Sequence, residues 1–141
     1  MKSMSPEEYR AFLLEGARTG KLATTHADGR PHVAPIWFTL DGDDIMFTTW
    51  HTTVKARALR RDPRAALLVD DERPPFAYVM VEGRVTISEN LGELRHWASR
   101  IAARYMGEEQ AESYGERNGV HGELLVRLTP LKVIAQAGIA E

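Results

Sequence analysis

The 141-residue chain contains no cysteine, which excludes disulfides, thiolate metal sites and thiol nucleophiles together. It also lacks any apolar run long enough to span a bilayer, and its first residues, MKSMSPEEYR, contain no signal-peptide core. The chain has no excess of positive charge, since its net charge is −2. Proteins that coat nucleic acid present a broad positive field, so the charge argues against such a function. We therefore expect a cytoplasmic protein without a membrane or nucleic-acid partner.

Familiar catalytic motifs are absent as well. The sequence has no HExxH, no GxSxG, no GxGxxG and no Walker loop. None of its histidines has the spacing of a helical zinc site; they stand at positions 26, 32, 51, 96 and 121. We expect no metal site, and the sequence alone identifies no catalytic residue.

Alternating short strands and turn signals predict one mainly β domain over residues 1–141. The predicted strands cover 21–26, 32–40, 45–50, 65–70 and 76–87, followed by one or two closing strands after residue 122. Helices are predicted after Ser5, over 54–61 and between Asn90 and Gly107, and a polar stretch over 108–122 is expected to be part helix and part loop. Pro35 inside a strand predicts a bulge or an unpaired amide, and Gly83 predicts a bulge or a bend. Six or seven antiparallel strands with flanking helices favour a small closed or half-closed barrel.

The densest charge on the chain lies in the stretch FTTWHTTVKARALRRDPR, residues 47–64. It carries five basic side chains against the single acid Asp62; they are Lys55, Arg57, Arg60, Arg61 and Arg64. A threonine cap, the positive end of a helix and a lysine in the first turn would suit one phosphate group. A solvated helix face explains the same composition, and the residues alone leave both readings open.

The order of several motifs resembles the pyridoxamine 5'-phosphate oxidase-like superfamily. These motifs are GRPHVAPIW (29–37), FTT (47–49), TxKARxLRRDPR (53–64), YVMVEGRV (78–85) and VRLTP (126–130). The likeness spans about residues 20–136 and is stronger to the flavin/deazaflavin-dependent oxidoreductases of that group. It implies a split β-barrel homodimer with two cofactor sites at the subunit interface.

The resemblance also implies roles for individual residues. It places the cofactor phosphate on Thr53, Lys55 and Arg57. Main-chain groups of Pro35, Ile36 and Trp37 would border the tricyclic ring, with Thr48 and Thr49 near its polar edge. Phe76 would reach across the dimer interface toward the ring, and an apolar core position is the alternative for it. His32 and Tyr78 are candidate proton donors.

The implied activity is hydride transfer between a reduced flavin-type ring and an unsaturated or conjugated small molecule. Coenzyme F420 is the first expectation, because Arg57, Arg60, Arg61 and Arg64 could follow its anionic tail; FMN is the alternative. The alternative hypothesis is that the protein carries a flavin or another pigment without catalysing a reaction. The chain departs from the family pattern at Ala58, where relatives often carry Asn, so one phosphate-side or structural hydrogen bond is missing. Val54-Lys55 stands in place of an Arg-Lys pair, and LTPLKVIAQAGIAE has no clear counterpart of the residues that bind the substrate phosphate, which makes oxidation of vitamin B6 the weaker expectation.

Overall fold

The computed structural model describes all residues, 1–141, as one eight-stranded antiparallel sheet with four helices. The strands are β1 (Lys2–Ser3), β2 (Gly20–Thr25), β3 (Pro31–Ile36), β4 (Thr39–Asp41), β5 (Asp44–Trp50), β6 (Arg64–Asp71), β7 (Ala77–Ser88) and β8 (Glu123–Ala137). The helices are α1 (Pro6–Leu14), α2 (Val54–Arg61), α3 (Leu91–Met106) and α4 (Glu108–Asn118).

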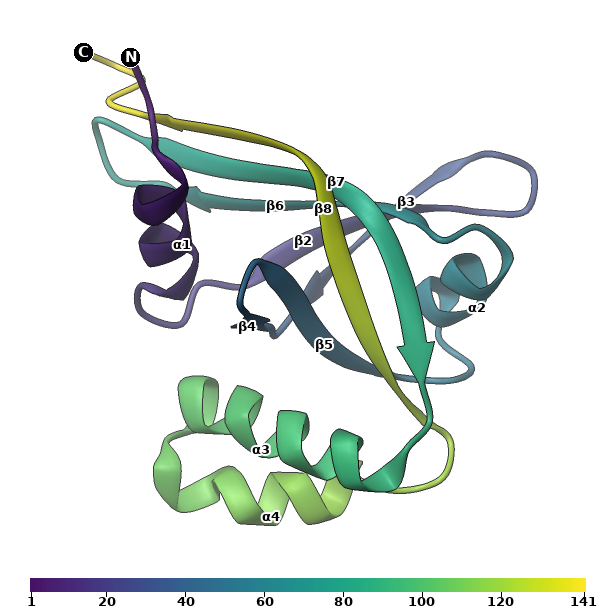
Figure 1. Ribbon diagram of the computed structural model, residues 1–141. Coiled ribbons are helices and arrows are strands. Elements are labelled where there is room, and N and C mark those ends of the chain that lie inside the picture. Colours follow the sequence, from purple (N-terminus) through teal and green to yellow (C-terminus); the bar gives the residue numbers. More distant parts are fainter.

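The strand order β3-β2-β6-β7-β8-β5-β4 makes the two longest strands the spine of the sheet. In Figure 1, β7 and β8 run side by side from the layer of β2, β3 and β6 down to β5. The register between β7 and β8 shifts at Glu82 and Gly83, where a Cβ on Gly83 would collide with the carbonyl of Thr129. The predicted bulge at Gly83 is therefore confirmed, and it lets the strands bend around the core.

The predicted mainly β, antiparallel fold is confirmed, with eight strands in place of six or seven. One added strand is the two-residue β1, which pairs with β8. The other arises because the predicted strand 32–40 is broken at Trp37 and Phe38 into β3 and β4. The closing segment is one strand of fifteen residues, and the polar stretch is helix α4 followed by a loop, as expected.

Pro35 needs no bulge. The register of β3 with β2 runs without interruption from Ile36 opposite Gly20 to Pro31 opposite Thr25. β3 ends the sheet, so a missing N–H that faces away from β2 breaks no ladder bond. Of the two predicted explanations for Pro35, the structure has the unpaired position.

One apolar core fills the curved sheet. Its most buried large side chains include Phe38, Phe47, Leu22, Ile45 and Leu128, all with no exposed surface. A smaller cluster of Met46, Leu94 and Leu125 attaches α3 to the outside of β5 and β8. In Figure 1, α3 and α4 therefore lie as a pair beneath β5.

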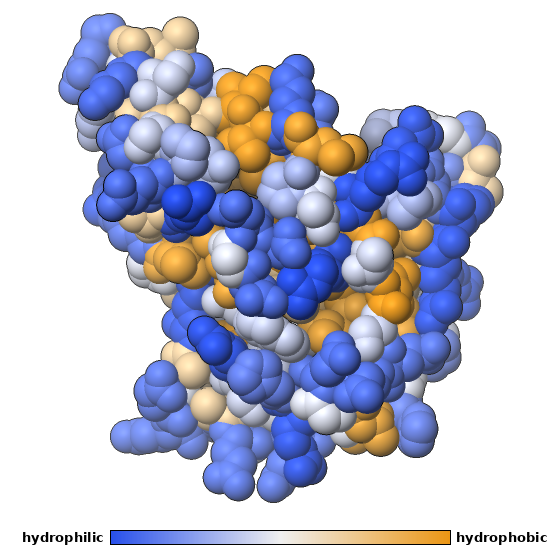
Figure 2. Space-filling view, viewed as in Figure 1, coloured by the Kyte–Doolittle hydropathy of each residue, from blue (hydrophilic) through white to orange (hydrophobic).

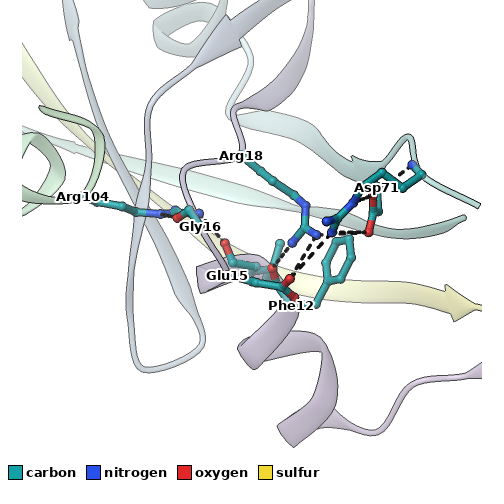
Figure 3. A network of polar contacts seen from close by, with 8 residues as sticks. Phe12, Glu15, Gly16, Arg18, Asp71 and Arg104 are labelled. Carbon is teal, nitrogen blue, oxygen red and sulfur yellow. Dashed lines mark hydrogen bonds and ion pairs between the residues drawn. The ribbon is translucent and has the colours of Figure 1, made fainter.

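Two arginines fix the chain between α1 and β2 (Figure 3). The Arg18 guanidinium donates to the Phe12 carbonyl at 3.1 Å and to the Asp71 carboxylate at 3.3 Å. Arg104, at the end of α3, donates to the carbonyls of Leu13, Gly16 and Phe38 at 2.7, 3.1 and 2.8 Å. Charged donors to backbone carbonyls form strong hydrogen bonds, so α3 is tied to α1 and to the break between β3 and β4.

The longest helix, α3, is amphipathic, and no helix of the chain is both long and apolar enough to cross a membrane. Figure 2 shows apolar side chains scattered among charged ones over the face on which β7 and β8 lie in front.

Candidate functional site

Strand β5 presents successive side chains to opposite sides, which separates the two predicted threonines. Phe47 and Thr49 face the core side, whereas Met46 and Thr48 face α3. Thr49 is 4% exposed and Thr48 is partly exposed. Only Thr48 therefore borders the space between the sheet and the helices.

Helix α2 begins at a threonine cap. The Thr53 hydroxyl accepts from the Ala56 N–H at 3.2 Å and donates to the Trp50 carbonyl at 3.0 Å. It also lies 2.8 Å from the Thr49 hydroxyl, which must then be the donor of that pair. The N–H groups of Val54 and Lys55 have no partner in the chain. The cap thus leaves two donors of the first turn free, while the Thr53 hydroxyl is already engaged.

A cavity of about 270 Å³, named here the Lys55 cavity, lies between β3, β5, α2 and the pair α3–α4. One wall carries five of the predicted cofactor residues, namely Pro35, Ile36, Trp37, Thr48 and Lys55. The opposite wall is made by Ala98, Ile101, Ala102, Tyr114 and Asn118. The cavity thus combines apolar side chains with one cation and a few polar groups, as small-molecule sites commonly do.

Lys55 is half-buried and has no hydrogen bond and no ion pair in the chain. Burial lowers the pKa of its ammonium, and the nearby Glu123 carboxylate opposes that shift. Burial likewise raises the pKa of Glu123, against the opposing charges of Lys55 and Arg117. An unpaired ammonium beside two free helix N–H groups is suited to bind an anion.

The remaining arginines of α2 and its C-terminal end differ in their availability. Arg60 pairs with Glu89 at 3.6 Å, and Arg61 donates to the Thr25 carbonyl at 2.6 Å. Arg64 makes two bonds to the Asp62 carboxylate, at 3.0 and 2.8 Å. Arg57 is exposed and has no partner. Among the predicted phosphate and tail residues, Arg57 is thus the one arginine whose guanidinium is free.

Three aromatic rings join the broken strand to the two helices. The Trp37 indole stacks on the Tyr105 ring at 5.0 Å between centroids and lies 6.2 Å from the Tyr114 ring at 51°. Tyr105 itself donates to the Arg18 carbonyl at 2.8 Å and accepts from the Phe38 N–H at 3.2 Å. Trp37 is therefore held in place although it is 40% exposed.

Other predicted residues lie elsewhere. Phe76 stands before β7, 40% exposed and at a φ of +68°, in a loop whose Phe76 carbonyl accepts from the Ile139 N–H. Tyr78 is near it. His32 is on β3 with its ring edge against His26, and its buried Nδ1 has no partner. None of these three side chains lines the Lys55 cavity of the single chain.

Sequence reasoning missed the wall formed by α3 and α4. The apolar spacing of Leu94, Ala98 and Ile101 predicts a packed helix face, but not what that face covers. Tyr114 and Asn118 lie in a polar segment without a motif, and their only signal is the spacing of four that puts them on one helix face. The sequence did not indicate that Glu123 lies near Lys55, because the position of Glu123 depends on the register of β8 with β5.

Solved structures of other proteins share the fold of this chain. A conserved hypothetical protein from Mycobacterium tuberculosis is 28% identical, with a TM-score of 0.85 over 96% of this chain and 86% of that one. An F420 reductase is also 28% identical, with a TM-score of 0.69 over 87% of this chain and 94% of that one. A FAD-binding protein from Mesorhizobium loti, 20% identical, shares the fold at a TM-score of 0.68 over 95% and 93% of the two chains.

The family model described as pyridoxamine 5'-phosphate oxidase matches residues 5–137, nearly the whole chain. The fold, the match and the related structures agree with the resemblance drawn from the motifs, and flavin-related oxidoreductase chemistry is the general function they support. The chain belongs to the pyridoxamine 5'-phosphate oxidase family.

Proposed function

We propose that the chain is an oxidoreductase that binds a flavin-type cofactor, coenzyme F420 in the first place, with its phosphate on Lys55. The observation that carries the proposal is the half-buried Lys55 ammonium without a partner, beside the free N–H groups of Val54 and Lys55. A buried cation left unpaired is unfavourable, and an anionic ligand relieves that cost. The similarity to an F420 reductase over 87% of this chain favours the deazaflavin over FMN.

The residues present suit the proposed cofactor. Pro35, Ile36 and Trp37 give the cavity a wall of apolar side chains, against which a planar ring can lie. Arg57, exposed and unpaired, is placed two residues from Lys55 and could hold an anionic tail. The other arginines would first have to leave Glu89, Thr25 or Asp62, so the tail contact is assigned to Arg57.

When bound, the reduced cofactor would supply a hydride to an unsaturated or conjugated acceptor. The chain's own contribution is to bind and orient. Lys55 neutralises the phosphate, and Thr48 offers a hydroxyl to the ring. The apolar side chains of α3 exclude water from the cavity. No acidic or imidazole side chain lines the cavity, so the proton that completes reduction comes from solvent in this proposal.

A second copy of the chain is part of the proposal. The outer face of the sheet carries an apolar row of Leu68, Met80 and Ile134, which are direct cross-strand neighbours on β6, β7 and β8. Leu68 is 38% exposed, and Phe76 and Ile139 extend the apolar surface at the same end of the sheet. A homodimer that buries this row would bring Phe76 into an interface.

The test is a titration of cofactor-free protein with coenzyme F420 and with FMN, followed by fluorescence. We expect Lys55→Met to weaken binding of either cofactor tenfold or more, since a charge-assisted hydrogen bond contributes about 1.5–3 kcal/mol. Arg57→Ala should weaken only coenzyme F420. Arg60→Ala, whose side chain is paired to Glu89, is the matched control.

Two results would contradict the proposal. If neither cofactor binds at micromolar concentration, the proposal that the chain binds a flavin-type cofactor is wrong. If Lys55→Met binds a cofactor as tightly as the parent, Lys55 does not hold the phosphate. A further arm separates an enzyme from a carrier. If the cofactor binds but its reduced form is oxidised by no member of a broad panel of conjugated acceptors, the non-catalytic flavin or pigment carrier takes the place of the enzyme.

A further inference from the structure

Helix α4 forms, together with α3, the wall of the Lys55 cavity that faces the predicted cofactor residues, and the sequence alone suggested no function for α4. Tyr114 and Asn118 lie one helical turn apart on its inner face, and both line the cavity. Neither side chain has a hydrogen-bond partner in the chain, although both are only partly exposed. Both side chains are therefore free to bond a ligand that enters the cavity.

Helix α4 is held firmly enough to form a binding surface. Gly115, between the two residues, is buried and packs so closely on α3 that an added Cβ would collide with the Ser99 hydroxyl and lie 3.0 Å from the Arg95 carbonyl. The Arg117 guanidinium lies 5.4 Å from the centre of the Tyr114 ring. Close helix packing on one side and a cation on its ring fix where Tyr114 points.

The two sides of the cavity differ in chemistry. The single cation, Lys55, stands on the α2 side, and Asn118 on α4 is neutral and offers both a donor and an acceptor. The Tyr114 ring meets the Trp37 indole at 51°, which makes an aromatic corner. An aromatic corner beside an amide suits a planar conjugated heterocycle with adjacent carbonyl and N–H groups.

We propose that Tyr114 and Asn118 are specificity-determining residues that contact the ring of the bound cofactor, Tyr114 by its aromatic face and Asn118 by hydrogen bonds to the ring's polar edge. This rests on the proposed function, because it assumes that the Lys55 cavity receives a flavin-type cofactor. It adds a division of labour in which α2 binds the phosphate and α4 recognises the ring.

The experiment compares each cofactor with its phosphate-free chromophore, namely FMN with riboflavin, and coenzyme F420 with 8-hydroxy-5-deazariboflavin. Dissociation constants are measured for the parent, Tyr114→Leu, Tyr114→Phe, Asn118→Leu and Lys55→Met. Glu112→Leu, on the exposed side of α4, is the control. Thermal unfolding of each variant without ligand separates lost contacts from lost folding.

We expect Tyr114→Leu and Asn118→Leu to weaken the phosphate-bearing and phosphate-free forms alike, by tenfold or more. Tyr114→Phe, which keeps the ring, should stay within about threefold of the parent, as tenfold in affinity corresponds to 1.4 kcal/mol. Lys55→Met should weaken only the phosphate-bearing form.

The inference is overturned if either leucine variant binds the chromophores within twofold of the parent, or if its loss is confined to the phosphate-bearing form. These results leave the proposed function intact as long as the parent binds a cofactor and Lys55→Met binds it at least tenfold more weakly. If the parent itself binds neither cofactor nor chromophore, it is the proposed function that fails.

Discussion

The Trp37 indole lies parallel to the Tyr105 ring, with 5.0 Å between centroids and 5° between planes. The Tyr105 hydroxyl anchors this stack because it bonds the Phe38 N–H and the Arg18 carbonyl. Tyr105→Phe keeps the stack and leaves both backbone groups without a partner, so we expect a loss of about 1–3 kcal/mol in the free energy of unfolding. Tyr105→Leu should cost about 0.5–1.5 kcal/mol more, for the lost aromatic pair. Guanidinium unfolding measures both, and equal stability of Tyr105→Phe and the parent would show that the hydroxyl bonds are unimportant.

Because α3 packs closely on α4, we expect a side chain at Gly115 to destabilise the protein. Alanine is favoured over glycine within a helix by about 1 kcal/mol. A Cβ at this position would nevertheless strike the Ser99 hydroxyl, and overpacking costs about 1–3 kcal/mol. We expect Gly115→Ala to lower the melting temperature, and the pair Gly115→Ala with Ser99→Ala to recover part of the loss. A higher melting temperature for Gly115→Ala alone would mean that the two helices separate easily.

The carboxyl of Glu123 should make anion binding depend on pH. Its pKa is raised by burial, so it becomes charged only at a higher pH than an exposed glutamate. Once charged, it competes with the ligand phosphate for Lys55. Affinity for a phosphate-bearing cofactor should therefore fall as pH rises through the raised pKa of Glu123.

Glu123→Gln removes that charge while keeping the shape of the side chain. We expect this variant to bind several-fold more tightly at neutral pH and to lose the pH dependence in the acid range. Titrations from pH 4.5 to pH 8 in parent and variant provide the measurement. The same slope in both proteins would assign it to another group.

The apolar row on the outer face predicts the effect of a charge at Leu68. Like charges brought together in a symmetric interface are strongly unfavourable, so Leu68→Glu should convert a dimer into a monomer. Sedimentation velocity reports the change. Val120→Glu is the control, since Val120 is 41% exposed in the loop after α4. A parent that sediments as a monomer would exclude the dimer outright.

The sequence predicted most elements, because their signals are local. The cap at Ser5, the alternation of Phe47 with Thr48 and the glycine at 83 each report on their own neighbourhood. The cavity is different, since it depends on which strand α3 packs against and on the tilt of α4. The placement of Tyr114 opposite Lys55 follows from contacts between segments about sixty residues apart, for which a single sequence has no periodic signal.

Five of the residues to which the motif resemblance assigns the cofactor line one wall of the cavity, and their contact with a cofactor stays a prediction. Lys55 has no partner in the chain, whereas Thr53 is used by the helix cap and Thr49 faces the other side of β5. A pattern of hydroxyl and basic residues cannot distinguish a side chain that awaits a ligand from one already bonded to its own backbone. Whether Phe76 reaches a partner's ring stays a prediction for the dimer.

The uninterrupted register of β3 with β2 has a consequence for solubility. Pro31 and Pro35 both lie on this terminal strand, at positions whose backbone nitrogen must face away from β2. Residues two apart face the same way, so among the three outward positions only Val33 keeps a hydrogen to donate. A strand that paired with the free edge of β3 would therefore meet one backbone N–H donor instead of three. Pro31 and Pro35, of which Pro35 also lines the Lys55 cavity, thus disfavour the pairing of another chain with this edge of the sheet.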